Sequence, residues 1–271
     1  MRYVNHNGRA FDFDRDGVAS SMSEGWDWEK EETVLNGTVY GFRDESREVD
    51  ISMAIGTSVD AHGIMEELYR VIVEDLRDSR NGYLERDGWR CDAYVKASAK
   101  KNADCTGPKG YALTALLLDG YWYRESTTSF FKIEASGGGV DYEYDYEYDY
   151  GGVGVARLVS NPSVYQSDFR MVVYGPATSP YVIIGGNRYE VSAHVPDGAV
   201  LIIDSKSGTV EGVYENGDRV NMFGDAADGG QGSGSYIFER IAPGDSAVSW
   251  DGTFGFDLTI RDRRDERSWT V

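Results

Sequence analysis

The chain has 271 residues, 41% of them hydrophobic and 27% charged, a balance typical of a globular protein with its own core. Its formal net charge of -19 argues against binding to nucleic acid or to an anionic membrane, because both need clustered lysine and arginine. The 33 glycines and 19 tyrosines, with only 6 prolines, favour a β-rich fold with many turns.

Two hairpins are predicted in the first half of the chain. Asn36 and Gly37 separate two short β-type runs within residues 33–42, and Asp87 and Gly88 separate a second pair of runs. Both dipeptides tolerate the positive φ angles that a two-residue hairpin turn requires. Each hairpin is a candidate arm for docking to a neighbouring subunit or partner.

One helix is predicted, over residues 61–80, between alternating strands at residues 49–55 and 111–117. Ser58 or Asp60 is its candidate N-terminal cap, and Asn81-Gly82 is expected to end it. Apolar side chains recur along it at helical spacing and are expected to face the core. They are Met65, Leu68, Tyr69, Ile72 and Leu76.

The composition changes abruptly between Ala135 and Gly154, and we place the domain boundary there. The predicted parts are an N-terminal domain (1–137), an acidic tyrosine-rich linker strand (138–154) and a C-terminal domain (155–271). Short apolar runs separated by turn-forming residues fill the C-terminal part, which is typical of an antiparallel β-sandwich. The runs span residues 169–174, 181–184, 189–195, 199–204, 209–214, 219–223, 236–241, 247–250 and 253–260.

The linker contains the run DYEYDYEYDY, residues 141–150. In an extended chain its tyrosines share one face and its acids the other. The tyrosines are candidate docking residues, because they can bury amphipathic area while the acids meet a basic partner or a neighbouring subunit. The alternative is a solvated edge strand, neutralised within the chain by Arg157 or the arginines of residues 261–264. The candidate docking residues are Tyr142, Tyr144, Tyr146 and Tyr148.

One motif suggests a cation site. Asp12, Asp14 and Asp16 precede Gly17, as in the first half of a calcium-binding loop. The twelfth position of such a loop should carry a bidentate glutamate, but here it is Ser23. An ordinary acidic turn is therefore favoured over a calcium site.

No other motif indicates catalysis, a metal or a cofactor. His6, His62 and His194 lack zinc-site spacing, and no nucleotide-binding glycine motif precedes a helix. Cys91 and Cys105 show no CxxC spacing and are expected to be two reduced thiols. No apolar run is long enough to span a bilayer. We therefore expect a protein that is not an enzyme.

The tryptophans leave an alternative function open. Stacked against sugar rings, they would make the protein a carbohydrate-binding β-sandwich module, or, with paired acids, a glycoside hydrolase. Most are expected to pack in the cores instead. The tryptophans considered are Trp26, Trp28, Trp122, Trp250 and Trp269.

Several stretches, among them GFRDESREVDISM and SYIFERIAPGDSAVSW, resemble the distal tail proteins (Dit) of siphophages that infect Gram-positive hosts. They occur in the family's order along nearly the whole chain, and the tyrosine–acid run is similar to a family linker. Glu143 and Glu147 stand where that linker usually carries prolines. The main stretches are GFRDESREVDISM, GYLERDGWRCDAYVKAS, NPSVYQSDFRMVVYGPATSPYVIIGGNRYEV and SYIFERIAPGDSAVSW.

The resemblance implies a mainly β, two-domain structural protein of the phage tail tip, or baseplate, without catalytic residues. Its N-terminal (belt) domain, a β-sandwich with one helix, would form a hexameric ring, and its C-terminal domain would be a galectin-like β-sandwich. The implied partners are further copies of the chain, the tail tube protein, a tail-tip or tail-associated protein and a receptor-binding protein. The implied location is the virion tail tip, after synthesis and assembly in the host cytoplasm.

Overall fold

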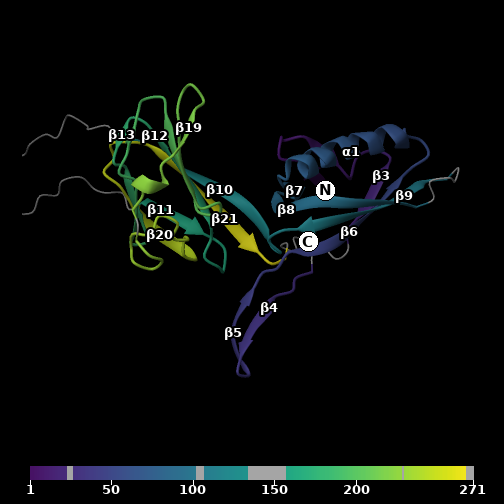
Figure 1. Cartoon of the computed structure of the whole chain (residues 1–271), viewed down its shortest axis with the longest axis horizontal. Coiled ribbons are helices and arrows are strands. Elements are labelled where there is room, and N and C mark those ends of the chain that lie inside the picture. The colour runs from purple at the N-terminus through teal and green to yellow at the C-terminus, as the bar shows by residue number, and fades with distance from the viewer. Residues whose placement is uncertain (23–26, 102–106, 134–156, 228, 267–271) are drawn as a thin grey trace, which may run out of the picture. The chain divides into compact units, whose positions relative to one another are not determined.

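The structure, a computed structural model, describes residues 1–22, 27–101, 107–133, 157–227 and 229–266 (Figure 1). The chain divides into two compact units: unit 1 comprises residues 1–124 and the C-terminal segment from residue 263, and unit 2 comprises residues 125–262. Strands β10 (Trp122–Phe130) and β21 (Phe256–Arg264) each run from one unit to the other. The predicted linker lies outside the described residues, so the three proposed domain ranges stay predictions.

Unit 1 contains an antiparallel sheet in the order β3-β6-β9-β8-β7-β1-β2. Strand β6 shows why these residues form it, since its alternate side chains, including Val49, Ile51 and Met53, are buried as predicted. The strands are β1 (Arg2–Val4), β2 (Ala10–Asp12), β3 (Val18–Ser21), β6 (Arg47–Ile55), β7 (Gly82–Arg86), β8 (Trp89–Lys101) and β9 (Lys109–Leu117).

Helix α1 (Ala61–Asp78) packs on this sheet. Asp60 caps it by accepting a hydrogen bond from the His62 backbone N–H at 3.1 Å, which confirms one of the two predicted caps. The helix ends earlier than predicted, because Ser79 adopts the left-handed conformation with φ 52°. Asn81-Gly82 therefore lies beyond the helix end.

The buried face of α1 differs from the predicted apolar stripe. Leu68 is buried as expected, but Ile64 and Val71 complete the buried face. Tyr69 and Leu76 lie on the flank of the helix and are 61% and 43% exposed. The prediction for these two residues was wrong, and an apolar flank of α1 is left in contact with solvent.

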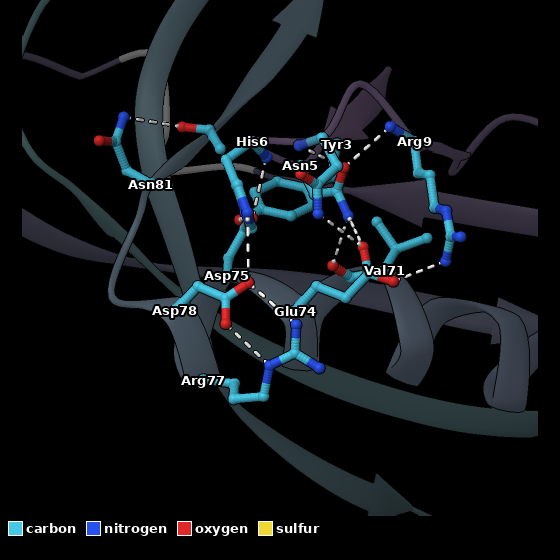
Figure 2. A network of polar contacts seen from close by, with 12 residues as sticks. Tyr3, Asn5, His6, Arg9, Val71, Glu74, Asp75, Arg77, Asp78 and Asn81 are labelled. Carbon is cyan, nitrogen blue, oxygen red and sulfur yellow. Dashed lines mark hydrogen bonds and ion pairs between the residues drawn. The ribbon is translucent and has the colours of Figure 1, made fainter.

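A buried polar network joins the C-terminal turn of α1 to β1 (Figure 2). The Tyr3 hydroxyl donates to Asp75 Oδ2 at 2.5 Å, and the His6 backbone N–H donates to Asp75 Oδ1 at 2.9 Å. The His6 ring lies between two carboxylates, with Nδ1 2.5 Å from Asp75 Oδ1 and Nε2 3.4 Å from Asp78 Oδ2. Burial and the hydrogen bond to Asp75 raise the pKa of Tyr3 far above its ordinary value. The network fixes the position of α1 on the sheet.

Unit 2 is an antiparallel sandwich. One sheet has the order β19-β18-β17-β12-β21 with β10 beside β21, and the other has the order β11-β20-β14-β15. Side chains from both sheets, such as Met171, Val182 and Phe256, enter one hydrophobic core. The strands are β11 (Arg157–Asn161), β12 (Phe169–Tyr174), β14 (Tyr181–Ile184), β15 (Asn187–Glu190), β17 (Val200–Asp204), β18 (Thr209–Val213), β19 (Arg219–Asn221) and β20 (Gly244–Ser249), with a short pair β13 (Ala177–Thr178) and β16 (His194–Val195) and a 3-10 turn η2 (Phe223–Asp225).

One predicted strand of unit 2 is absent. Residues 236–241 form turns and isolated bridges rather than a strand. Side chains of β15 hold this segment: Asn187 Nδ2 donates to the Tyr236 carbonyl at 2.9 Å, and the Tyr189 hydroxyl donates to the Glu239 carbonyl at 2.7 Å. Because these side chains satisfy the backbone, an apolar run here needs no sheet partner. The mainly β fold with one α-helix is nevertheless as predicted.

Candidate interaction surfaces

The Asn36-Gly37 hairpin forms an exposed two-stranded arm, β4 (Glu31–Leu35) and β5 (Thr38–Arg43), in a small sheet of its own. Both turn residues have positive φ, 50° and 77°, as a two-residue hairpin turn requires. The predicted hairpin is therefore confirmed. Figure 1 shows the arm extending away from β6, β8 and β9, with α1 on the other side of those strands.

The arm exposes an unusual amount of apolar surface. Across the hairpin, Val34 faces Val39, and Glu32 faces Phe42. Five large apolar side chains of the arm are each more than half exposed, and none belongs to either hydrophobic core. An isolated two-stranded hairpin is marginally stable in water, so this apolar surface calls for a partner. The five residues are Val34, Leu35, Val39, Tyr40 and Phe42.

Four charged residues hold the base of the arm. Lys30, just before β4, binds Asp44, just after β5, and also binds Asp265 at 2.5 Å. Arg263 binds the same Asp44, and all four side chains are 14–17% exposed. Burial alone would lower the pKa of Lys30, but its hydrogen bonds to Asp265 and Asp44 raise that pKa above the ordinary 10.5. Lys30 is therefore charged at neutral pH, and the clamp fixes where the arm leaves unit 1.

The Asp87-Gly88 hairpin is also confirmed, with φ angles of 53° and 80° at its turn. Its strands lie inside the sheet, where Leu84 and Cys91 are fully buried. Only the tip of the hairpin, at Asp87 and Gly88, is exposed. Whether this tip docks stays a prediction.

A groove runs beside α1, between its apolar flank and β8. Its volume is about 440 Å³. Met65, Tyr69, Ile72 and Leu76 form the helix wall, Ala97 and Ser98 line the strand side, and Leu68, Val95 and Leu113 form the floor. The lysines Lys96 and Lys100 lie at its edge. The groove could not be found from the sequence, because its walls were assigned to the core.

The other sequence candidates are distributed as follows. Tyr142, Tyr144, Tyr146 and Tyr148, and with them the whole tyrosine–acid run, lie outside the described residues. The Asp14 carboxylate already has two partners: it forms an ion pair with the amino group of Met1 and accepts a hydrogen bond from the Ser20 hydroxyl. Within the described ranges, no three histidine, cysteine or acidic side chains are grouped as a metal would require.

The tryptophans give little support to a sugar-binding platform. Trp122 is fully buried, and Trp250 packs against Phe130 and Phe256 in the core of unit 2. Trp28 is 55% exposed, while Trp26 and Trp269 lie outside the described residues. In the part of the chain that the structure describes, no helix has the length and apolarity to cross a bilayer.

The fold is similar to that of solved phage tail and baseplate proteins, although no protein-family model and no curated protein matches the sequence. SPP1 Dit (gp 19.1), described as a paradigm of the hub adsorption apparatus in phages infecting Gram-positive bacteria, aligns with a TM-score of 0.56 and 8% identity over 97% of this chain and 98% of that one. Two structures of the phage P2 baseplate in its activated conformation also align. The one with Ca gives 0.58 and 11% identity over 98% of both chains, and the one with Sr gives 0.61 and 12% over 98% of this chain and 100% of that one. The fold is therefore Dit-like along nearly the whole chain, as the sequence resemblance implied.

Proposed function

We propose that the protein is a structural component of a phage tail tip, and that copies of it associate through the β4–β5 arm into a ring. The ring would be hexameric and would join the tail tube to the tip and host-adhesion complex. The observation that carries this proposal is the exposed apolar arm, on a chain whose fold matches phage tail and baseplate proteins from end to end.

Physical chemistry supports self-association. An arm with this much exposed apolar surface gains free energy when a partner covers it, at roughly 25 cal/mol per Å² of apolar area. The charged clamp at Lys30 and Asp44 holds the arm away from its own sheet, so a second molecule is the natural cover. A ring built from identical copies needs two different complementary surfaces on each copy. The arm would be one of the two.

The same proposal assigns the remaining partners and the location. The ring would contact the tail tube protein on one side and a tail-tip or tail-associated protein and a receptor-binding protein on the other. Tyr142, Tyr144, Tyr146 and Tyr148, with the Asp87-Gly88 tip, are further candidate docking points. The location would be the virion tail tip, and the role would require no catalysis.

Native mass spectrometry and negative-stain imaging of the full chain test the proposal. We expect a concentration-dependent oligomer that the double variant Tyr40→Ser/Phe42→Ser disrupts while leaving the thermal unfolding temperature nearly unchanged. The matched control, Val164→Ser/Val220→Ser, removes two exposed apolar side chains from unit 2 and should leave assembly intact. If the control and the arm variant assemble alike, the arm is not the contact.

A further inference from the structure

The groove beside α1 has a structural origin that makes it a preformed acceptor. Strand β8 buries every second side chain up to Val95, and a register shift between Val95 and Ala97 then interrupts its pairing with β9. Beyond this bulge, all six remaining residues of β8 are exposed, and the strand side of the groove is lined by the small side chains of Ala97 and Ser98. These side chains do not fill the space beside Ile72 and Leu76, so the groove stays open.

The groove combines apolar walls with two lysines, and the acid that also lines it, Glu66, is paired with Arg70 at 3.3 Å. Tyr69 and Leu76 expose 61% and 43% of their surface along it, although both belong to the apolar pattern of the helix. Lys96 at the edge is held by Glu48, but Lys100 forms no ion pair with any described residue. In a chain with a net charge of -19, a cation beside an exposed apolar surface favours an occupant that is both apolar and acidic.

The arm has the same two properties. Phe42 and Tyr40 are 69% and 68% exposed, and Glu32 lies directly opposite Phe42 in the hairpin register. The Glu32 carboxylate forms no ion pair with any described residue. An apolar side chain with a carboxylate beside it is thus presented near the clamped base of the arm, two positions from Lys30 and Asp44.

We propose that the arm of one copy docks in the α1–β8 groove of a second copy, with Phe42 and Tyr40 entering the groove and Glu32 reaching Lys100. The inference rests on the proposed self-association and names its second surface. An arm cannot fill the groove of its own chain, because α1, which forms one wall of the groove, lies on the other side of β6, β8 and β9 from the arm (Figure 1). The occupant is therefore another copy, and each copy is donor at one side and acceptor at the other. Such a head-to-tail contact closes into a ring or continues as a filament.

The size of the contact explains how assembly would depend on concentration. Two aromatic side chains bury about 150–250 Å² each. Their combined area is roughly half of the 800 Å² that each partner buries in a standard stable interface. A single arm–groove contact is then weak, and repetition around a ring stabilises it. A trapping experiment is consequently better than a search for stable dimers.

Crosslinking between two differently labelled copies provides that trap. In a Cys105→Ser background, isotopically labelled Thr38→Cys protein, which keeps Tyr40 and Phe42, is mixed with unlabelled Leu76→Cys protein and treated with a short bismaleimide. We expect labelled–unlabelled conjugates joining positions 38 and 76, at least about tenfold more abundant than with the control acceptor Val220→Cys, which is exposed to a similar degree in unit 2. Equal yields from the two acceptors would overturn the proposal.

Charge reversal gives a second test, in which the same conjugate is measured with the cysteine positions unchanged. Lys100→Glu and Glu32→Lys should each reduce the specific conjugate several-fold, and their combination on opposite copies should restore it. Rings that form without the 38–76 conjugate would overturn the groove assignment and leave the proposed function intact. The conjugate without rings would support the groove and contradict the ring, and the absence of both would overturn both.

Discussion

The Lys30 ammonium lies 2.5 Å from Asp265 Oδ1, although the two residues are 235 positions apart in the sequence. This contact ties the start of the arm to the segment that follows β21. The exposed arm is thus anchored by the last described part of the chain, and its direction depends on a few partly buried charges.

Replacing Lys30 with methionine should loosen the arm. The change keeps the length of the side chain but leaves Asp265 without its lysine and leaves Asp44 with Arg263 alone. We expect a loss of about 1–3 kcal/mol in the free energy of unfolding, because the lost hydrogen bonds are charge-assisted and largely shielded from water. Hydrogen exchange should show faster exchange in β4 and β5. Lys96→Met removes an exposed ion pair and should change stability by about 0.5 kcal/mol or less.

The sequence predicted the hairpin as a candidate arm, but it did not predict which of the arm's side chains are exposed. The Asn36-Gly37 pair specifies the turn by its need for positive φ, a local property. Whether Val34 or Phe42 is covered depends on which other strands lie beside them, and no local pattern contains that information. The runs EETVL and TVYGFR do not alternate, so they gave no sign of a one-sided or a free hairpin.

The helix shows the opposite failure. An apolar periodicity ranks Tyr69 and Leu76 as core residues and ignores Asp75, which is fully buried. Asp75 faces inward because Tyr3 in β1 and His6 in the turn after β1 supply its hydrogen bonds. Such a long-range polar partner shifts the buried face of α1, and the groove is the consequence. The resemblance to phage tail proteins predicted the overall fold better than it predicted this surface.

Gly82→Ala should test the packing around Asp75. A Cβ at residue 82 would lie 2.3 Å from the Val4 carbonyl oxygen, 2.6 Å from Asp75 Oδ2 and 2.8 Å from the Tyr3 hydroxyl. We expect a destabilisation of roughly 2–4 kcal/mol in chemical denaturation, because backbone and a buried network must both move. Gly41→Ala is the control, since its Cβ would meet nothing within 4 Å. Equal stabilities of the two variants would contradict this account of the network.

Alkaline pH should destabilise both units through buried tyrosines. Burial raises the pKa of Tyr3 and of Tyr189 far above the ordinary 10.0. A raised folded-state pKa contributes stability that is fully present below the unfolded value of 10.0 and is lost as the pH rises beyond it. The free energy of unfolding should therefore fall above about pH 10 and stay level just below it. Tyr3→Phe and Tyr189→Phe should each flatten part of that fall, as measured by denaturation at a series of pH values.

The two hairpin turns should respond differently to the same substitution. Gly37 and Gly88 both have φ near 80°, so valine at either position strains the turn. Gly37→Val should fray only the free arm, lowering self-association while the unfolding midpoint of the chain stays nearly constant. Gly88→Val should lower that midpoint, because β7 and β8 carry the buried Leu84 and Cys91. Circular dichroism melts and native mass spectrometry of the two variants, side by side, would separate the roles of the two hairpins.

Salt should strengthen the assembly of copies. Each chain carries a formal charge of -19, so a six-membered ring would carry 6 × -19 = -114 charges. At about 0.1 M salt the screening length is near 10 Å, which is short enough to remove most of the repulsion between neighbouring exposed surfaces. The apolar part of the arm contact is insensitive to this screening. Salt would weaken the attraction between Glu32 and Lys100 by less than it weakens the repulsion between whole copies. Light scattering from low to moderate ionic strength should therefore show that the oligomer grows as salt is added. An oligomer that dissociates instead would mean that ion pairs, and not apolar burial, hold the copies together.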